Sequence, residues 1–117
     1  MNKPIIPVNE PYLGQREKDL VNECLESGWI SSAGKYIEKF ENEFAAYCEC
    51  SGGVTTTSGT TAIHLALKSL DVGPGDEVLV PAFTMVGSVY PIVQCGASPV
   101  FVDSEPDTGN IDVQDLE

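Results

Sequence analysis

Two segments near the start of the chain repeat hydrophobic residues at the spacing of an amphipathic helix. The first covers residues 15–27, and the second covers about residues 35–47. Gly28 follows the first segment directly, at a position that suits a helix C-cap. Residues 1–14 show no helical period, so we expect them to form an extended N-terminal arm.

Beyond the second helix, β-branched or apolar runs alternate with helical segments. The predicted strands are residues 54–57, 77–81 and 99–103, and the predicted helices between them are residues 60–70 and 84–95. The helix over 60–70 is apolar on nearly all sides, which predicts that it is buried. Pro91 predicts a kink in the helix over 84–95, because its ring clashes with a carbonyl one turn back. Asn110 suits the cap of a further helix that runs into the chain end.

This alternation indicates an α/β fold with a parallel sheet and flanking helices. The chain has 117 residues, of which 42% are hydrophobic, and this length allows one small domain. Three parallel strands form a small open sheet whose edges need covering. The pattern therefore already suggests part of a larger fold.

The charge balance narrows the possible partners. Eighteen Asp and Glu residues against six Lys and Arg residues give a net charge of -12. This charge argues against binding a nucleic-acid backbone or an anionic lipid surface. No apolar run reaches the roughly 20 residues of a membrane span, and the N-terminus lacks the pattern of a signal peptide. We therefore expect a cytoplasmic protein.

The spacing of the four cysteines matches no common metal-binding or redox motif. Cys48 and Cys50 are separated by one residue, whereas zinc and redox motifs separate their cysteines by two. His64 is the one histidine of the chain, so the sequence offers few ligands for a zinc site of the Cys/His type. We expect no metal site, and we expect reduced thiols that pack as small hydrophobic groups.

Residues 57–62, Thr-Ser-Gly-Thr-Thr-Ala, join a predicted strand to a predicted helix and carry the strongest local signal. The first N–H groups of a helix lack intrahelical partners, and the helix dipole is positive there. Gly59 allows close approach of an anion, and the hydroxyls of Ser58, Thr60 and Thr61 add donors. The alternative is structural, with Ser58 as an N-cap and Gly59 in a turn. This stretch alone leaves both interpretations open.

A second candidate lies at the end of the middle predicted strand, in residues 81–85. Ligands of parallel sheets bind outside the carboxyl ends of the strands. Phe83 and Met85 are side chains against which a flat cofactor ring could stack. The alternative, which their size and spacing favour, is that both are core residues.

Other titratable residues favour structural roles. Asp103, Glu105 and Asp107 could act as acid–base groups, but a charge-rich turn explains them better. His64 could act as a general base, but a lone histidine on an apolar helix favours a hydrogen-bonded core residue. No lysine lies in an obvious desolvated pocket of the kind that activates its amine.

Taken together, four stretches resemble the opening of the DegT/DnrJ-type family of pyridoxal-phosphate (PLP) nucleotide-sugar aminotransferases, within the aspartate-aminotransferase fold. They are residues 28–36 (GWISSAGKY), 57–67 (TSGTTAIHLAL), 73–78 (GPGDEV) and 96–103 (GASPVFVD). Their order and spacing match the family over nearly the whole chain. The perosamine-synthase branch, which acts on a GDP-linked 4-keto-6-deoxy sugar, looks most similar.

The resemblance implies roles for residues at the matching positions. Ser58, Gly59, Thr60 and Thr61 would hold the PLP phosphate. Met85 stands where the family usually has an aromatic ring over the pyridine. The loop after the first helix implies substrate contacts from Trp29, Ser31 and Ser32. Pro91 departs from the small or polar residues that are usual in its helix.

The resemblance also implies what this chain does not contain. The family's catalytic lysine and its small C-terminal domain lie downstream of Glu117, so residues 15–117 would be part of the large PLP-binding domain and none would be catalytic. The resemblance implies a homodimer that transfers an amino group, from glutamate, to a nucleotide sugar. Two alternatives stay open: a PLP-dependent sugar dehydratase on the same fold, and a non-catalytic phosphate-binding or interaction module.

Overall fold

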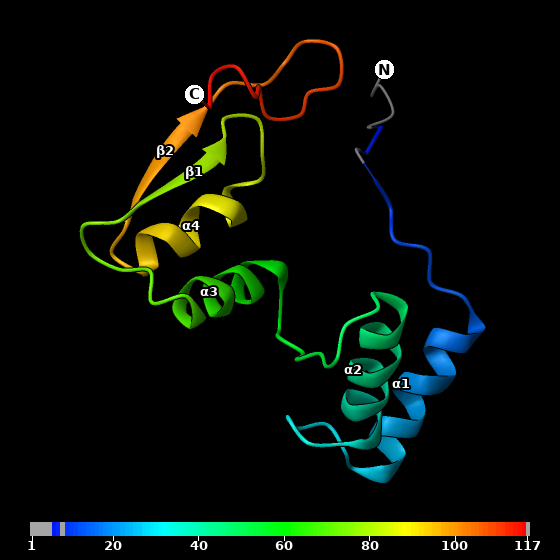
Figure 1. Cartoon of the computed structure of the whole chain (residues 1–117). Helices are drawn as coiled ribbons and strands as arrows, with labels where there is room; N and C mark the ends of the chain where they lie inside the picture. The colour runs from blue at the N-terminus through cyan, green and yellow to red at the C-terminus, as the bar shows by residue number, and fades with distance from the viewer. Residues whose placement is uncertain (1–5, 8, 117) are drawn as a thin grey trace. The chain divides into compact units, whose positions relative to one another are not determined.

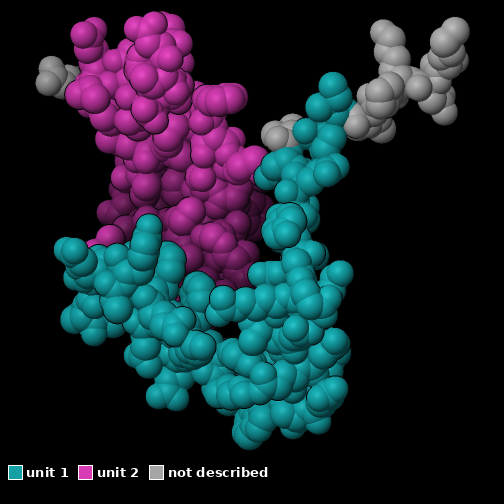
Figure 2. Space-filling view, turned by 90° about the vertical axis from the view of Figure 1, so that its right-hand side faces the viewer, with its two compact units in different colours: residues 1–53 teal, residues 54–117 magenta. Residues whose placement is uncertain are grey.

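The computed structural model describes residues 6–7 and 9–116. Within the predicted N-terminal arm, residues 1–5 and 8 lie outside the described residues. The chain divides into two compact units, residues 1–53 and residues 54–117, which Figure 2 colours teal and magenta.

Unit 1 contains the two helices that the hydrophobic pattern predicts, with the predicted bounds. They are α1 (Gln15–Ser27) and α2 (Lys35–Tyr47) (Figure 1). The described residues before α1, which are 6–7 and 9–14, carry no helix or strand. Gly28 ends α1 with a φ of 74°, and its N–H donates to the carbonyl of Leu25. Both helices are largely exposed, since α1 buries no residue and α2 buries Ala45 alone.

The end of α2 is closed by a Schellman motif. The N–H of Glu49 donates to the carbonyl of Ala46 at 3.2 Å, and the N–H of Cys50 donates to the carbonyl of Ala45 at 2.8 Å. Glu49, at the position between Cys48 and Cys50, has a φ of 55°. This left-handed conformation favours glycine, so the turn holds a non-glycine residue in a costly part of backbone space.

Unit 2 has an α/β architecture. Its elements are α3 (Gly59–Ser69), β1 (Glu77–Pro81), α4 (Val86–Gln94) and β2 (Ser98–Val102). The two strands pair in parallel, with Glu77 opposite Ser98 and Pro81 opposite Val102. Helix α4 contacts both strands and also α3, so it lies between α3 and the sheet (Figure 1). The predicted parallel α/β class is confirmed.

The core of unit 2 forms where α4 meets the sheet. Its buried cluster is Val80 of β1, Ile92 of α4 and Ala97, and the partly buried Leu67 of α3 packs against it. Pro91 is also buried, and α4 continues past it to Gln94. The kink that Pro91 predicts stays a prediction.

Two predicted elements are wrong in the described residues. Residues 54–57 form no strand, and the sheet contains β1 and β2 alone. A β-branched run becomes a strand when another strand pairs with its backbone, and no such partner is described here. No helix follows Asn110 either. Instead Ser104 and Ile111 form an antiparallel bridge, and the carbonyl of Asn110 accepts from the N–H of Glu105 at 2.9 Å.

The prediction that the third helix is buried is also wrong for this chain. Helix α3 has no fully buried residue, and Ile63 and Leu65 are exposed. One side of α3 packs on α4 through Leu67, and no described element covers the other sides. Its all-round apolar surface therefore remains available to a further layer of protein.

Candidate functional site

The start of α3 is a reciprocal capping arrangement between Ser58 and Thr61. Ser58 Oγ accepts a hydrogen bond from the N–H of Thr61 at 3.3 Å, and Thr61 Oγ1 accepts one from the N–H of Ser58 at 3.0 Å. The N-cap interpretation of Ser58 is thereby confirmed. Because each side chain is already bonded to the other residue's backbone, their main contribution is to hold the first turn in a fixed geometry.

The same capping leaves two N–H groups of the first turn without an intrahelical acceptor. These belong to Gly59 and Thr60, the first two residues of α3, where the helix dipole is positive. Apart from its chain neighbours and the backbone of its own helix, no described atom lies within 4 Å of the place where a side chain of Gly59 would begin. The backbone here is therefore open to an approaching anion, as the phosphate-cradle interpretation requires.

Thr60 brings the first turns of two helices together. A Cβ placed on Gly87, in the first turn of α4, would lie 2.6 Å from Thr60 Oγ1. Such close approach is possible because Gly87 has no side chain. The N-terminal ends of α3 and α4 therefore meet at this contact, and Figure 1 shows both at the end of the unit toward which β1 points. Two positive helix ends at one place favour an anion more than one does.

Met85 lies beside this junction, and neither Met85 nor Phe83 is a core residue. Met85 is the N-cap residue of α4, two positions before Gly87, and is 80% exposed. Phe83 is 81% exposed. The interpretation that both are buried is wrong for this chain. Both side chains are therefore free to contact a ligand held at the helix ends.

The acidic residues after β2 form a structured turn. The carboxylate of Glu105 accepts hydrogen bonds from the N–H of Asp107 and from the N–H and hydroxyl of Thr108. The Thr108 hydroxyl, the strongest influence, lowers the pKa of Glu105. Asp103 Oδ1 accepts from the N–H of Ser104 at 2.8 Å. These carboxylates are engaged in local backbone bonds, so the charge-rich-turn interpretation is confirmed.

His64 does not match its expected structural role. It is half-buried on α3, and its Nε2 atom is buried with no hydrogen-bond partner among the described residues. The expectation of a hydrogen-bonded core histidine is therefore wrong within this part of the chain. His64 lies one helical turn beyond Thr60, on the same side of α3.

In unit 1, the loop between α1 and α2 borders a hollow of about 860 Å³. Trp29, Ser31 and Ala33 of the loop line it, together with Lys35 and other residues of the first turns of α2. Trp29 and Ser32 are exposed, and Ser31 Oγ accepts a weak hydrogen bond from the N–H of Ala33 at 3.5 Å. The loop therefore presents one aromatic ring and small hydroxyl groups at a concave surface.

An ionic cluster that was not predicted from the sequence lies beside this hollow. The Glu23 carboxylate accepts hydrogen bonds from Lys35 Nζ and Tyr36 Oη. The bond from Lys35 lowers the pKa of Glu23, and the same bond raises the pKa of Lys35. Because Lys35 is held in its charged form, it is not an activated amine. The partners lie on different helices, so local spacing gave no signal for this cluster.

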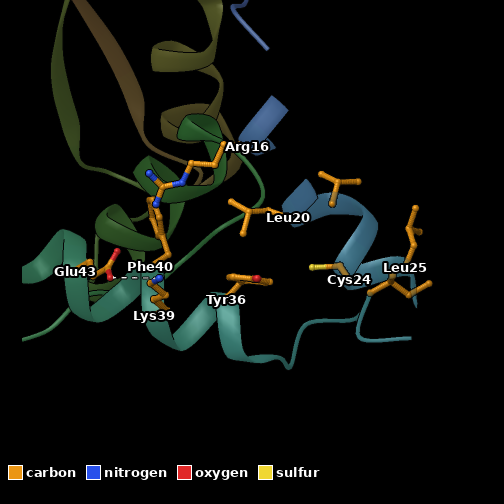
Figure 3. A pocket seen from close by; sticks show the side chains of 10 residues that line it. Arg16, Leu20, Cys24, Leu25, Tyr36, Lys39, Phe40 and Glu43 are labelled. Atoms are coloured by element: carbon orange, nitrogen blue, oxygen red, sulfur yellow. Dashed lines mark ion pairs between the residues drawn. The ribbon is translucent and has the colours of Figure 1, made fainter. Parts of the chain in front are cut away.

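A second concave surface of unit 1 is an apolar groove of about 460 Å³ between α1 and α2 (Figure 3). Leu20 and Cys24 of α1 and Phe40 of α2 line its middle. The Lys39–Glu43 ion pair, with 3.8 Å between Nζ and Oε1, lies along its α2 side. No candidate from the sequence analysis falls in this groove.

The cysteines follow the expected packing only in part. Cys95 is buried and Cys24 is half-buried, but Cys48 and Cys50 are exposed, so small-hydrophobe packing is wrong for that pair. All four thiols are free. Within residues 6–7 and 9–116, no three His, Cys, Asp or Glu side chains gather as a metal site. No helix in the described residues is long and apolar enough to cross a membrane.

Comparison with known proteins gives a family match and close sequence relatives. Residues 11–117 match the model of the DegT/DnrJ/EryC1/StrS aminotransferase family. A GDP-perosamine synthase of Vibrio cholerae is 48% identical over 112 residues, which are 96% of this chain and 30% of that protein. A GDP-perosamine synthase of Escherichia coli O157:H7 is 50% identical over 112 residues, 96% of this chain and 31% of that protein. The chain thus spans under a third of these relatives.

Solved structures of similar proteins share the fold over nearly the whole chain. Spr1654 of Streptococcus pneumoniae, in its PLP-form, superposes with a TM-score of 0.85 at 39% identity, covering 95% of this chain and 28% of that one. A GDP-4-keto-6-deoxymannose-3-dehydratase gives a TM-score of 0.81 at 29% identity, covering 94% of this chain and 30% of that one. The expected fold class, part of a PLP-dependent aminotransferase domain, is confirmed.

Proposed function

This chain belongs to the DegT/DnrJ/EryC1/StrS aminotransferase family, and we propose that it supplies the phosphate-holding part of a PLP-dependent sugar aminotransferase. The observation that carries this proposal is the junction of two helix N-termini at Thr60 and Gly87. In the proposed site the N–H groups of Gly59 and Thr60 bind the PLP phosphate, and Ser58 and Thr61 hold their turn in place.

In this proposal the cofactor supplies the reaction chemistry, and the residues of this chain bind and orient the cofactor. Bound PLP supplies the electron sink that amino transfer needs. Thr60 adds its hydroxyl as a phosphate donor, and the dipoles of α3 and α4 favour the phosphate dianion. The exposed Met85 offers a polarizable thioether to the face of the pyridine ring, in the place of an aromatic ring.

For the substrate, we propose a GDP-linked 4-keto-6-deoxy sugar, with glutamate as the amino donor. Support comes from the identity of 48–50% to two GDP-perosamine synthases over 96% of this chain. Trp29, Ser31 and Ser32 are the proposed substrate contacts, because they expose a ring for stacking and hydroxyls for hydrogen bonds.

The remaining properties concern the whole protein and are also proposed. The catalytic lysine comes from the region that corresponds to the rest of the relatives, since Lys35 is tied to Glu23. Residues 15–117 form part of the large PLP-binding domain, with residues 1–14 as an arm. The active enzyme is a cytoplasmic homodimer. No catalytic residue is proposed within residues 1–117.

A sugar dehydratase is the second candidate function. The superposition on the GDP-4-keto-6-deoxymannose-3-dehydratase favours it, although identity is lower, at 29%. In this alternative the same residues hold the PLP phosphate, and a histidine replaces the lysine of the downstream region. The two functions therefore differ outside residues 1–117.

The test is a chimeric enzyme in which this chain replaces the matching segment of the Vibrio cholerae GDP-perosamine synthase. We expect the chimera to bind PLP and to form the amino sugar from GDP-4-keto-6-deoxymannose and glutamate. Thr60→Val should weaken PLP binding by about 10-fold or more, because a hydrogen bond to a charged phosphate is lost. Ser69→Ala, at the opposite end of α3, is the matched control and should leave PLP binding unchanged.

Each result of this test has a defined meaning. A folded chimera that binds no PLP would contradict the phosphate-holding role. Equal PLP affinity for Thr60→Val and Ser69→Ala would exclude the Thr60 hydroxyl as a phosphate ligand. The chimera does not separate the two candidate functions, which differ in the residue at the downstream lysine position: a lysine there would favour the aminotransferase and a histidine the dehydratase.

A further inference from the structure

Cys48 and Cys50 form a pair of exposed thiols at the end of α2. Both are free, and one residue separates them. The proposed aminotransferase function uses neither of them. Their exposure also removes the usual explanation of a free cysteine, which is burial as a small hydrophobic group.

The backbone that carries the two thiols is fixed by three hydrogen bonds. The N–H of Cys48 donates to the carbonyl of Phe44 at 3.0 Å, and the Schellman bonds from Glu49 and Cys50 follow it. Cys50 Sγ also lies 3.5 Å from the carbonyl oxygen of Cys48, so its side chain folds back toward that residue. The left-handed Glu49 makes this return possible. Both thiols are thus carried by one turn of fixed backbone, two positions apart.

Two thiolates without a third ligand suit a particular class of ion. Thiolate sulfur is a soft ligand that selects Cu(I), whereas structural zinc takes four ligands. Among the described residues no third His, Cys, Asp or Glu completes a cluster here. The net charge of -12 attracts a cation of any kind. The ligand set therefore favours a soft ion of low coordination number.

We propose that Cys48 and Cys50 together bind one monovalent thiophilic metal ion of the Cu(I) class. On binding, the two S–H bonds break, two sulfur–metal bonds form and two protons pass to solvent. No electron is transferred, because the ion stays monovalent and both sulfurs stay reduced. The site does not depend on the proposed PLP function.

The experiment titrates the reduced full chain with Cu(I), supplied anaerobically as its coloured bicinchoninate complex. We expect one Cu(I) per chain to leave the complex, with the loss of its colour. Cys48→Ser and Cys50→Ser should each lower the affinity at least 10-fold, as the loss of a metal ligand does. Cys24→Ser, which removes the half-buried thiol of the same unit, is the matched control and should bind as the unchanged chain does.

A second measurement distinguishes loss of the ligand from loss of the fold. X-ray absorption of the loaded chain should show sulfur as the only neighbour of copper, and circular dichroism should show unchanged helix content in both serine variants. The proposal is overturned if the chain takes no Cu(I) from the complex. It is equally overturned if Cys48→Ser and Cys50→Ser bind as tightly as Cys24→Ser.

Discussion

Ser58 and Thr61 each donate a backbone N–H to the side-chain oxygen of the other, at 3.3 Å from Thr61 to Ser58 Oγ and 3.0 Å from Ser58 to Thr61 Oγ1. Thr61 Oγ1 also donates to the carbonyl of Ser58 at 2.8 Å. The entrance to α3 is therefore closed on itself by a short local network. This network sets the orientation of the two N–H groups, from Gly59 and Thr60, that the proposed phosphate site uses.

The first prediction concerns the stability of this helix entrance. Ser58→Ala should lower the free energy of unfolding by about 1 kcal/mol, because the N–H of Thr61 loses its acceptor. Urea unfolding followed by circular dichroism gives this value. Ser69→Ala, whose hydroxyl donates to Ala66 at the far end of α3, should change stability by no more than about 0.5 kcal/mol. Equal losses in the two variants would contradict a special role for the cap.

The second prediction concerns residues in left-handed backbone conformation after helices. Glu49 after α2 and Asp71 after α3 have φ values of 55° and 59°. Glu49→Gly and Asp71→Gly should each raise the free energy of unfolding by up to about 1 kcal/mol, because glycine adopts this conformation without strain. Thermal unfolding would show the gain as a higher midpoint, and an unchanged or lower midpoint would contradict it.

The opposite substitution after α4 is the matched comparison. Gly96 has a φ of 82°, and a Cβ there would lie 3.1 Å from Pro74 Cγ. Gly96→Ala should therefore lower the free energy of unfolding by about 1–2 kcal/mol, since backbone strain and crowding act together. The same thermal measurement applies, with a lower midpoint as the expected result.

The third prediction follows from the ionic contact between α1 and α2. The pKa of Glu23 is lowered in the folded state, chiefly by Lys35, so its stabilising effect is present at neutral pH and is lost as acid protonates it. The pKa of Lys35 is raised, so the effect is also lost in strong base. Glu23→Gln should therefore lower the unfolding midpoint near pH ~7, and the difference from the unchanged chain should shrink as the pH falls below about 4. A difference that persists in acid would contradict this ionic origin.

The fourth prediction separates the core of unit 2 from its surface. Ile92 is 2% exposed inside the buried cluster, whereas its neighbour Val93 is 56% exposed on the same helix. Ile92→Ala should cost about 2–4 kcal/mol, since it removes buried methyl groups and leaves a cavity. Val93→Ala should cost less than about 1 kcal/mol. Urea unfolding of both variants measures the difference, and similar losses would place the core elsewhere.

The elements that the sequence predicted correctly are those with a strong local pattern. The two N-terminal helices, at 15–27 and 35–47, have amphipathic repeats that need no distant partner to be recognised. The strand predicted at 54–57 failed because a strand also needs a neighbour with which to pair. The helix predicted after Asn110 failed because the bridge between Ser104 and Ile111 bound this stretch in another way.

The candidate site divides in the same manner. The cap at Ser58 followed from residue types in a six-residue stretch, because capping is a local interaction. The close approach of Thr60 and Gly87 brings together residues 27 positions apart, and local sequence spacing could not predict this contact. The contact of Glu23 with Lys35 and Tyr36 likewise joins two helices. We expected a hydrogen-bond partner for His64, but its Nε2 atom has none among the described residues. This outcome depends on tertiary packing, which local sequence patterns do not predict.

The sequence by itself determined the bounds of α1 and α2, the parallel α/β pattern and the cap at the start of α3, because short-range hydrogen bonding and hydrophobic spacing control all three. Only the tertiary structure decided that the first turns of α3 and α4 meet at Thr60 and Gly87. It also decided that the Cys48 and Cys50 thiols stay exposed while Cys95 is buried. The physical reason is that burial and close approach depend on which elements pack together, and residues distant in the chain govern that packing.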